Sequence, residues 1–337
     1  MTDTMRSHAA TIGAGLAGAA LAALVGVPAG ALVGSTLAVA GVAAAGLRVG
    51  LPRPARDLAF ATIGVSLGSG IDERLFDQIG TWTASLAILV ASLAATILAG
   101  RAVLTRGFGL DAQTATLASS PGTMSNAIAI AADGHGDASA VMFLQLMRLL
   151  VLVVAVPPLA VALDGSASGT GGTMAAMSLP ELAALLAIAL VLGMLGTRAG
   201  LPAAALLSGM IVSATGHAFG WVHGVAPAWA IFLAFATTGA VLGSRMSRVT
   251  GGQLARYAVA GLASVATALL LSLGFAVLAQ LLTGLPFGQI WIAYAPGGVE
   301  AMAAIGLSLG YDPAYVAVHH FARILALVLI VPLALKL

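Results

Sequence analysis

Hydrophobic stretches follow one another along nearly the whole chain, separated by short polar or glycine-rich breaks. Ten of them approach the roughly 20 apolar residues that a helix needs to cross a hydrocarbon core about 30 Å thick. The apolar residues run on without the alternation that is typical of a membrane β-barrel. The pattern therefore predicts membrane helices over residues 8–27, 29–47, 57–71, 80–100, 138–162, 179–197, 201–217, 226–243, 257–282 and 313–335.

Two further apolar stretches, residues 111–134 and 286–309, are each interrupted in the middle by a Pro-Gly pair. Proline disrupts the interior of a helix but suits its first position. Each stretch is therefore predicted to form two half-helices that meet at a break, which lies at Pro121 in the first stretch and at Pro296 in the second. Irregular backbone of this kind is tolerated at membrane depth only where protein buries it or water reaches it.

The chain contains the same pattern twice, with unusual residues returning at a constant offset of 175. Near the start of each copy the offset is one residue shorter. A duplicated membrane protein with helix breakers and charges at matching places is the usual sequence form of a secondary transporter. The returning residues include Ala59-Phe60-Ala61-Thr62 as Ala234-Phe235-Ala236-Thr237, Pro121-Gly122 as Pro296-Gly297, Asp137 as Asp312, Gln145 as His320, and Arg148 as Arg323.

The duplication divides the chain into four parts. We expect a cytoplasmic tail over residues 1–7, a first repeat over 8–162, a Gly/Ser-rich linker over 163–178, and a second repeat over 179–337. In transporters with repeats of this kind, substrate and coupling-ion sites lie near the middle of the bilayer, at the interface between the repeats.

The arginines predict an orientation, because cytoplasmic loops collect Lys and Arg. The bias moves to different loops in the second copy, so we expect the copies to be inverted, with a cytoplasmic amino terminus. Inversion needs an odd number of crossings per half, and the broken segments are therefore expected to enter and leave on one side. Twelve crossings with two broken spanning helices remain the alternative. The arginines concerned are Arg6, Arg48, Arg53, Arg56, Arg101 and Arg106 in the first copy, and Arg198, Arg245, Arg248 and Arg256 in the second.

The composition places the chain among integral membrane proteins. Of its 337 residues 60% are hydrophobic and 8% charged, against about 25% charged in soluble domains. The 42 glycines suit close helix contact in a bundle. The fold class that we predict is an all-α, multi-pass membrane protein with two inverted repeats, about 10 transmembrane helices and two re-entrant (broken) hairpins.

The chemistry is expected at the breaks. There the second half-helix begins with unpaired backbone N–H groups and the positive end of the helix dipole, which together favour an anion. The predicted substrate-binding residues at the breaks are Ser120, Pro121, Gly122, Ser125 and Asn126 in the first copy, and Pro296, Gly297, Gly298 and Glu300 in the second.

The helix after each broken segment carries an arginine inside an apolar run. An arginine at the bilayer centre costs at least about 2.5 kcal/mol, so it normally faces a cavity or a partner. Gln145 shares a helix face with Arg148, and His320 shares one with Arg323, because the residues of each pair are three apart. These four residues are expected to bind the substrate. Alternatively, Arg148 and Arg323 bracket the open carbonyls of the broken segments, with Glu300 neutralising one of them, and the two roles are compatible.

Three titratable residues are candidates for coupling transport to an ion, namely Glu300, His319 and His320. Asp137 and Asp312 directly precede helices and are expected to cap them. His and carboxylate residues do not recur with metal-binding spacing, and the chain has no cysteine, so no metal or cofactor is expected. The dispersed arginines form no nucleic-acid stripe.

The residues at the breaks resemble the AbrB-duplication family of bacterial inner-membrane proteins, whose members also carry the label ammonia monooxygenase. The resemblance rests on Ser-Pro-Gly-Thr-Met-Ser-Asn (120–126) with Gln145 and Arg148, and on Ala-Pro-Gly-Gly-Val-Glu-Ala-Met (295–302) with His319, His320 and Arg323. It implies location in the bacterial inner membrane. The family names suggest gene regulation or ammonia oxidation, but a monooxygenase needs copper or iron ligands and a transcription factor needs a DNA-binding surface.

The residues favour a secondary transporter or exporter of a small organic solute, expected to be anionic, that works by alternating access with proton or sodium coupling. The first two spans of each half would form a scaffold and the remaining spans and hairpins a moving core. The partners are the solute, the coupling ion and the lipid bilayer, and a homodimer is compatible with the sequence. The alternatives are a membrane sensor or regulator without transport and, less favoured, a membrane enzyme.

Overall fold

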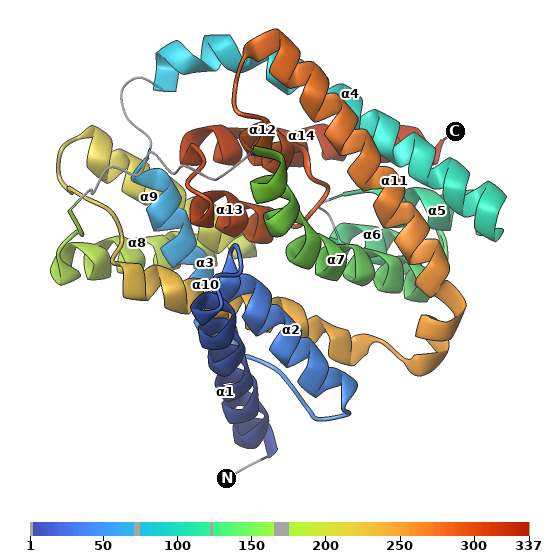
Figure 1. Cartoon of the computed structure of the whole chain (residues 1–337), viewed down its shortest axis with the longest axis horizontal. Helices are drawn as coiled ribbons and strands as arrows, with labels where there is room; N and C mark the ends of the chain where they lie inside the picture. Colours follow the sequence, from blue (N-terminus) through green and yellow to red (C-terminus); the bar gives the residue numbers. More distant parts are fainter. Residues whose placement is uncertain (1–2, 71–74, 122–123, 165–174, 337) are drawn as a thin grey trace. The chain divides into compact units, whose positions relative to one another are not determined.

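The computed structural model describes residues 3–70, 75–121, 124–164 and 175–336, and the side chains of all these except Asp3, residues 75–79, Thr81, Ser125 and Asn126. Within these residues the backbone is helical apart from turns, short connections and one isolated bridge between Ala176 and Val225 (Figure 1). The α-helices are α1 (Asp3–Leu24), α2 (Gly30–Ala44), α3 (Arg53–Gly68), α4 (Leu75–Phe108), α5 (Ala112–Ser119), α6 (Met124–Ala132), α7 (Ala138–Asp164), α8 (Leu179–Arg198), α9 (Ala204–Ala218), α10 (Ala228–Ser244), α11 (Gly251–Thr283), α12 (Phe287–Tyr294), α13 (Val299–Ser308) and α14 (Pro313–Leu335).

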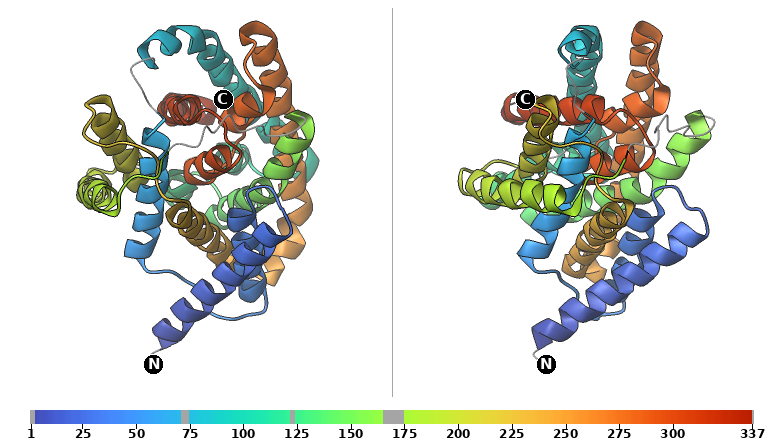
Figure 2. Two further views of the ribbon diagram at one scale, coloured as in Figure 1. Left: turned by 60° about the vertical axis from the view of Figure 1, so that its left-hand side comes forward. Right: turned by 90° about the vertical axis from the view of Figure 1, so that its left-hand side faces the viewer.

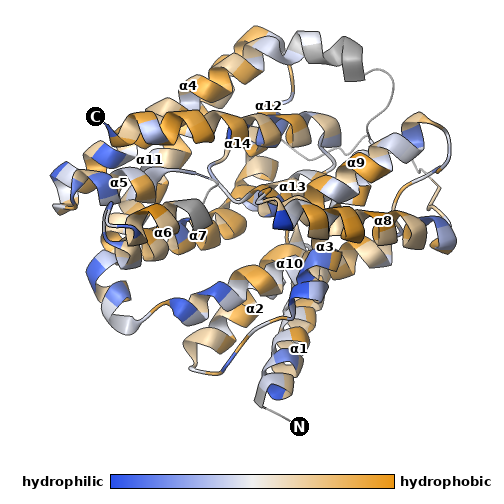
Figure 3. Ribbon diagram, turned by 180° about the vertical axis from the view of Figure 1, so that it is seen from behind, coloured by the Kyte–Doolittle hydropathy of each residue, from blue (hydrophilic) through white to orange (hydrophobic). Residues whose placement is uncertain are grey.

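Seven of the described helices are long and apolar enough to cross a membrane: α1, α4, α7, α8, α10, α11 and α14. Hydrophobic residues cover most turns of α4 and α14 (Figure 3). Helices α2, α9 and α13 are also apolar but shorter. The prediction of an all-α, multi-pass membrane protein is confirmed.

Both predicted breaks are present. In the first apolar stretch α5 ends at Ser119 and α6 begins at Met124, and in the second α12 ends at Tyr294 and α13 begins at Val299. Proline disfavours the helical conformation of the residue before it. Ser120 and Ala295, the residues before the two prolines, accordingly have extended ψ angles of 118° and 130°.

The helices recur at the offset found in the sequence. Helix α9 begins 174 residues after α2, and α12, α13 and α14 each begin 175 residues after α5, α6 and α7. The turns that precede α2 and α9 share an unusual backbone, because Ala29 and Ala203 both have left-handed φ angles, of 53° and 51°. Such a conformation is uncommon for a residue other than glycine. The same local structure is therefore built twice, including its strain.

The helices form two compact units, and each unit draws on both copies. Unit 1 contains α1, α2, α3, α8, α9 and α10 with residues 300–317, and unit 2 contains α5, α6, α7, α11, α12, most of α4 and α14 from Val318 onward. Unit 1 thus holds three helices of each half, where the first two spans of each half were expected to form the scaffold, and the role of these helices in transport stays a prediction. Helices α3 and α10 group with the first two because they pack tightly on them.

Glycines account for this close packing in unit 1. Helix α3 crosses α9, and α10 crosses α2, while α1 packs along α2 and α8 along α9 (Figure 2). A Cβ atom on Gly64 would collide with the carbonyl oxygen of Leu206, and one on Gly239 would collide with that of Leu32. Because Gly64 and Gly239 are equivalent in the two copies, the two crossings are built alike. Small residues allow backbones to approach in this way.

Unit 2 is organised around α7, which packs against α5, α6, α11 and α12. The two ends of the first broken segment meet at the start of α7, where the backbone N–H of Asp137 donates to the hydroxyl of Thr114 at 2.7 Å. The second broken segment begins at the other end of α7, where the N–H of Gly288 donates to the carboxylate of Asp164 at 3.0 Å. A helix of 27 residues is ~40 Å long, so the two segments begin far apart.

Candidate functional site

The first break is held by Arg148 of α7. The last turn of α5 leaves carbonyl groups without helical partners, as every helix end does. The guanidinium of Arg148 donates to the carbonyl oxygens of Ala118 at 3.2 Å, Ser119 at 3.4 Å and Ser120 at 2.9 Å. Arg148 is only 3% exposed, so its guanidinium donates hydrogen bonds to these carbonyls in place of water.

The second break is held in the same way by Arg323 of α14. Its guanidinium donates to the carbonyl oxygens of Ala295 at 2.7 Å and Gly297 at 2.8 Å. The side chain of Arg323 is completely buried. The predicted bracketing of the breaks by both arginines is confirmed, while contact of either arginine with a substrate stays a prediction.

Each arginine places a positive charge at its break, and both belong to unit 2. Charge of one sign in a poorly screened interior produces a strong local potential. The region of the breaks in unit 2 is therefore electrostatically suited to an anion.

Gln145 and His320, which occupy equivalent positions, differ in their surroundings. The amide of Gln145 donates to the carbonyl oxygen of Leu117 at 2.8 Å and accepts from Arg148 at 3.4 Å. The imidazole of His320 is 1% exposed, and in the described part of the chain neither of its ring nitrogens has a hydrogen-bond partner. A buried polar group without a partner costs about 1–3 kcal/mol. The two copies have thus diverged at this position.

His319 belongs to a polar network that the sequence did not indicate. Its Nε2 lies 2.9 Å from the hydroxyl of Ser85 on α4, and the hydroxyl of Tyr294 donates to the carbonyl of Ser85. The imidazole also packs against the rings of Trp82 and Tyr294, each with centroids 6.3 Å apart. The position of Tyr294 directly before the second break could have indicated its part in this network. Ser85 gave no such signal, because it stands alone in an apolar run of α4.

Glu300 lies in the first turn of α13, three residues after Gly297, and is partly exposed. Within the described residues its carboxylate makes no hydrogen bond and no ion pair. Glu300 groups with unit 1, whereas the arginines and histidines of the site group with unit 2.

The remaining predicted residues lie at the breaks themselves. Ser120, Pro121, Pro296 and Gly297 are buried and Gly298 is partly exposed. Within the described residues, the hydroxyls of Ser119 and Ser120 are buried without a hydrogen-bond partner. Gly122 and the side chains of Ser125 and Asn126 lie outside the described residues, so their predicted role is untested.

Aspartates cap helices next to both broken segments. Asp137 accepts from the backbone N–H groups of Ser139 and Ala140, and Asp312 caps α14 in the same way, which confirms the predicted roles. Asp111 caps α5 by accepting from the N–H of Thr114 at 2.8 Å. Burial raises the pKa of Asp111, but hydrogen bonds, led by those from Thr114, outweigh it and hold this pKa below its ordinary value.

Comparisons with known proteins point to the same family that the residues at the breaks resemble. The family model described as transition state regulatory protein AbrB matches residues 31–337. The chain is 25% identical over 309 residues to "Putative regulator AbrB" of Escherichia coli (strain K12), covering 90% of this chain and 88% of that protein. It is 24% identical over 288 residues to "Uncharacterized protein YhjN" of Bacillus subtilis (strain 168), covering 80% of this chain and 75% of that protein.

Proposed function

The chain belongs to the AbrB family, and from the chemistry of its breaks we propose that it is a secondary transporter of a small anionic organic solute. One observation carries this proposal: two equivalent helix breaks, each bracketed by a buried arginine of the following helix. Breaks at matching places of two repeats are the form in which transporters build a binding site. A purely structural membrane protein has no need for two such costly interruptions.

Inverted repeats with re-entrant hairpins agree with the contacts in unit 2. The two ends of the first broken segment are joined by the hydrogen bond between Thr114 and Asp137, which favours a hairpin over a spanning helix. The second segment begins at the opposite end of α7, beside Asp164. If α7 crosses the membrane, the hairpins enter from opposite sides. Alternating access in such transporters is a rocking of one bundle against the other around the site.

The direction of α14 supports the same arrangement. Arg101, near the end of α4, donates to the carbonyl of Ala334 near the end of α14. The last residue of α4, Phe108, lines a pocket of about 220 Å³ together with Asp137, at the start of α7. The start of α7 and the end of α14 therefore lie near the same end of α4. Equivalent helices that run in opposite directions are what inversion requires.

An anionic solute suits the charges at the breaks. Arg148 and Arg323 are buried positive charges, and the half-helices α6 and α13 begin with the positive ends of their dipoles at the breaks. Because the terminal guanidinium nitrogens hold the backbone, we propose that the arginines attract the anion through charge and that backbone N–H groups bind it.

For proton coupling, His320 is the first candidate. Its imidazole is buried, and in the described part of the chain neither ring nitrogen is paired, so a proton or a solute group can occupy either one. His319, the preceding residue, and Arg323, three residues later, are the nearest charged or titratable residues on the same helix. His319 is already engaged by Ser85, which makes it the weaker candidate. Glu300, partly exposed in the first turn of α13, is the second candidate.

The alternative function is a membrane sensor or regulator that does not transport. It rests on the names of the family and of the Escherichia coli protein, both of which refer to regulation. A sensor needs a ligand site and a partner but no flux, and so the measurement that separates the two functions is flux itself.

The test begins with a thermal-shift screen of the purified protein against small organic anions, followed by counterflow of each hit in proteoliposomes. We expect at least one anion to exchange across the membrane, and expect Arg323→Ala to abolish the exchange while Arg256→Ala, at an exposed position, preserves it. Anions that bind and stabilise the protein without any exchange would overturn the transport proposal and favour the sensor.

A further inference from the structure

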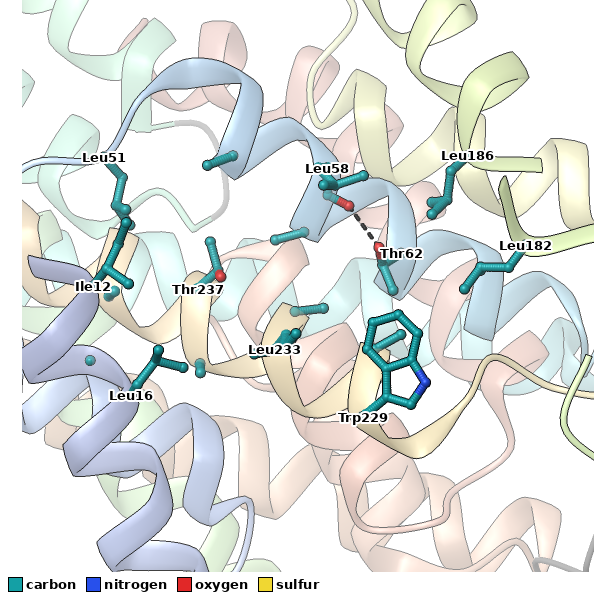
Figure 4. A pocket seen from close by; sticks show the side chains of 17 residues that line it. Ile12, Leu16, Leu51, Leu58, Thr62, Leu182, Leu186, Trp229, Leu233 and Thr237 are labelled. Carbon is teal, nitrogen blue, oxygen red and sulfur yellow. Dashed lines mark hydrogen bonds between the residues drawn. The ribbon is translucent and has the colours of Figure 1, made fainter. Parts of the chain in front are cut away.

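Unit 1 contains a groove of about 350 Å³ between α1, α3, α8 and α10 (Figure 4). Apart from Thr62 and Thr237, the residues that line it are apolar. The hydroxyl of Thr62 is occupied, because it donates to the carbonyl of Leu58 on its own helix at 2.9 Å. The groove therefore offers hydrocarbon contacts and almost no hydrogen bonds.

The groove is elongated and is lined alike by the two copies. Leu58 of α3 and Leu233 of α10 are equivalent residues, lie in the middle, and are both 44% exposed. Leu51 lies at one end and Trp229 at the other (Figure 4). Along α10 the residues that line the groove run from Trp229 to Ala240, which is eleven helical steps or ~17 Å.

Positive charge gathers at the Leu51 end of the groove. Arg53 follows Leu51 by two residues, is exposed, and begins α3. The N–H of Gly50 donates to the hydroxyl of Thr11 at 2.9 Å, which brings the first turns of α1, with Arg6, to the same end. Arg56 is neutralised by its ion pair with Asp57 at 2.7 Å. At the other end Trp229 is 57% exposed.

We propose that this groove binds an acyl chain of an anionic phospholipid, with the lipid phosphate held at Arg53 and the chain running past Leu58 and Leu233. An elongated apolar groove with cations at one end suits the acyl chain and the charged head group of such a lipid. A second copy of the chain is the alternative occupant, and it is one outcome of the test below. The proposal concerns unit 1 and does not depend on transport.

The test uses Trp229 as a native probe of the groove. The purified protein in detergent is titrated with phosphatidylglycerol whose acyl chains are brominated, since bromine quenches tryptophan fluorescence on contact. Subtracting the signal of Trp229→Phe assigns the quenching to the groove. We expect saturable quenching of Trp229, with brominated phosphatidylcholine several-fold weaker, and no competition by inorganic phosphate.

Two variants decide whether the lipid lies as proposed. Arg53→Gln should weaken phosphatidylglycerol binding about fivefold, whereas Arg198→Gln, an exposed arginine at the end of α8, should not. Leu233→Phe enlarges the side chain in the middle of the groove without adding a tryptophan to the signal and should weaken binding, whereas Leu270→Phe, at an exposed position of α11, should not. Equal quenching by both lipids, unaffected by Arg53→Gln, would overturn the proposal. A dimer that Leu233→Phe disrupts without any bound lipid would assign the groove to a second copy.

Discussion

The guanidinium of Arg323 and the carbonyl of Ala295 lie 28 residues apart in sequence and 2.7 Å apart in space, and Arg148 contacts the carbonyl of Ser120 at the same separation of 28 residues. The residue at the break differs between the copies, serine in one and alanine in the other. The contact survives because it is made to the backbone. What the duplication preserves is therefore a way of closing an open helix end in a medium without water, where each unpaired carbonyl is costly.

Loss of this bracket should destabilise the protein strongly. Arg323→Ala leaves the carbonyls of Ala295 and Gly297 without a donor, and each unsatisfied buried group costs about 1–3 kcal/mol. We expect a loss of about 2–5 kcal/mol in the free energy of unfolding, measured by denaturant titration in detergent. Arg256→Ala, whose side chain is exposed, is the matched control and should change stability little.

Replacement by lysine separates charge from geometry. Arg323→Lys keeps the positive charge but loses the planar fork that reaches two carbonyls at once. We expect it to lose a substantial part of the stability that Arg323→Ala loses. Near wild-type stability of Arg323→Lys would mean that charge alone holds the second break.

The sequence predicted much of the fold because its strongest signals are local. Apolar runs, the Pro-Gly breaks and the offset of 175 residues gave the helices, their interruptions and their recurrence. The grouping of α3 and α10 with the first two helices of each half was missed, since it depends on close backbone crossings. Single glycines such as Gly64 and Gly239 mark these crossings, but in a chain with 42 glycines nothing local distinguishes them.

Gly64 offers a direct test of the crossing between α3 and α9. A methyl group at this position would meet the backbone carbonyl of Leu206, which cannot rotate away. We expect Gly64→Ala to cost about 1–3 kcal/mol, as overpacking does, and Gly239→Ala to cost a similar amount. Gly41→Ala, on α2 with open space around it, is the control. It should be neutral or stabilise by about 0.5–1 kcal/mol, because alanine is the better helix former. Thermal unfolding of the three variants measures the difference.

The site was predicted less completely than the fold. Arg148, Arg323 and their carbonyl partners follow from one argument, that a charge in an apolar run must have a partner. The network of His319, Ser85 and Tyr294 does not, because Ser85 reaches the break from a different helix. Which of two adjacent histidines is engaged depends on the rotation of α14 about its axis, and spacing in the sequence does not fix that rotation.

Inversion of the repeats predicts that equivalent residues face opposite sides of the membrane. Ser69 and Ser244 follow the same sequence motif at the ends of α3 and α10, and each hydroxyl donates to a carbonyl three residues earlier. Because the chain contains no cysteine, Ser69→Cys and Ser244→Cys can each be labelled alone with a membrane-impermeant maleimide. We expect labelling of one from outside the cell and of the other only after the membrane is opened. Labelling of both from the same side would contradict inversion.

The final prediction concerns the residue that carries the proton. His320→Gln gives the second copy the residue that the first copy has at Gln145, where the amide bonds well with the neighbouring carbonyl, so this variant should fold. If His320 couples transport, the variant should lose proton-driven accumulation and its pH dependence in proteoliposomes, while counterflow exchange persists, because exchange needs no net proton movement.

His135→Gln, at an exposed histidine between α6 and α7, is the control and should behave as wild type. Glu300→Gln, tested in parallel, assigns the role to the second candidate if it abolishes accumulation and His320→Gln does not. Accumulation with unchanged pH dependence in both variants would exclude both residues as the coupling site.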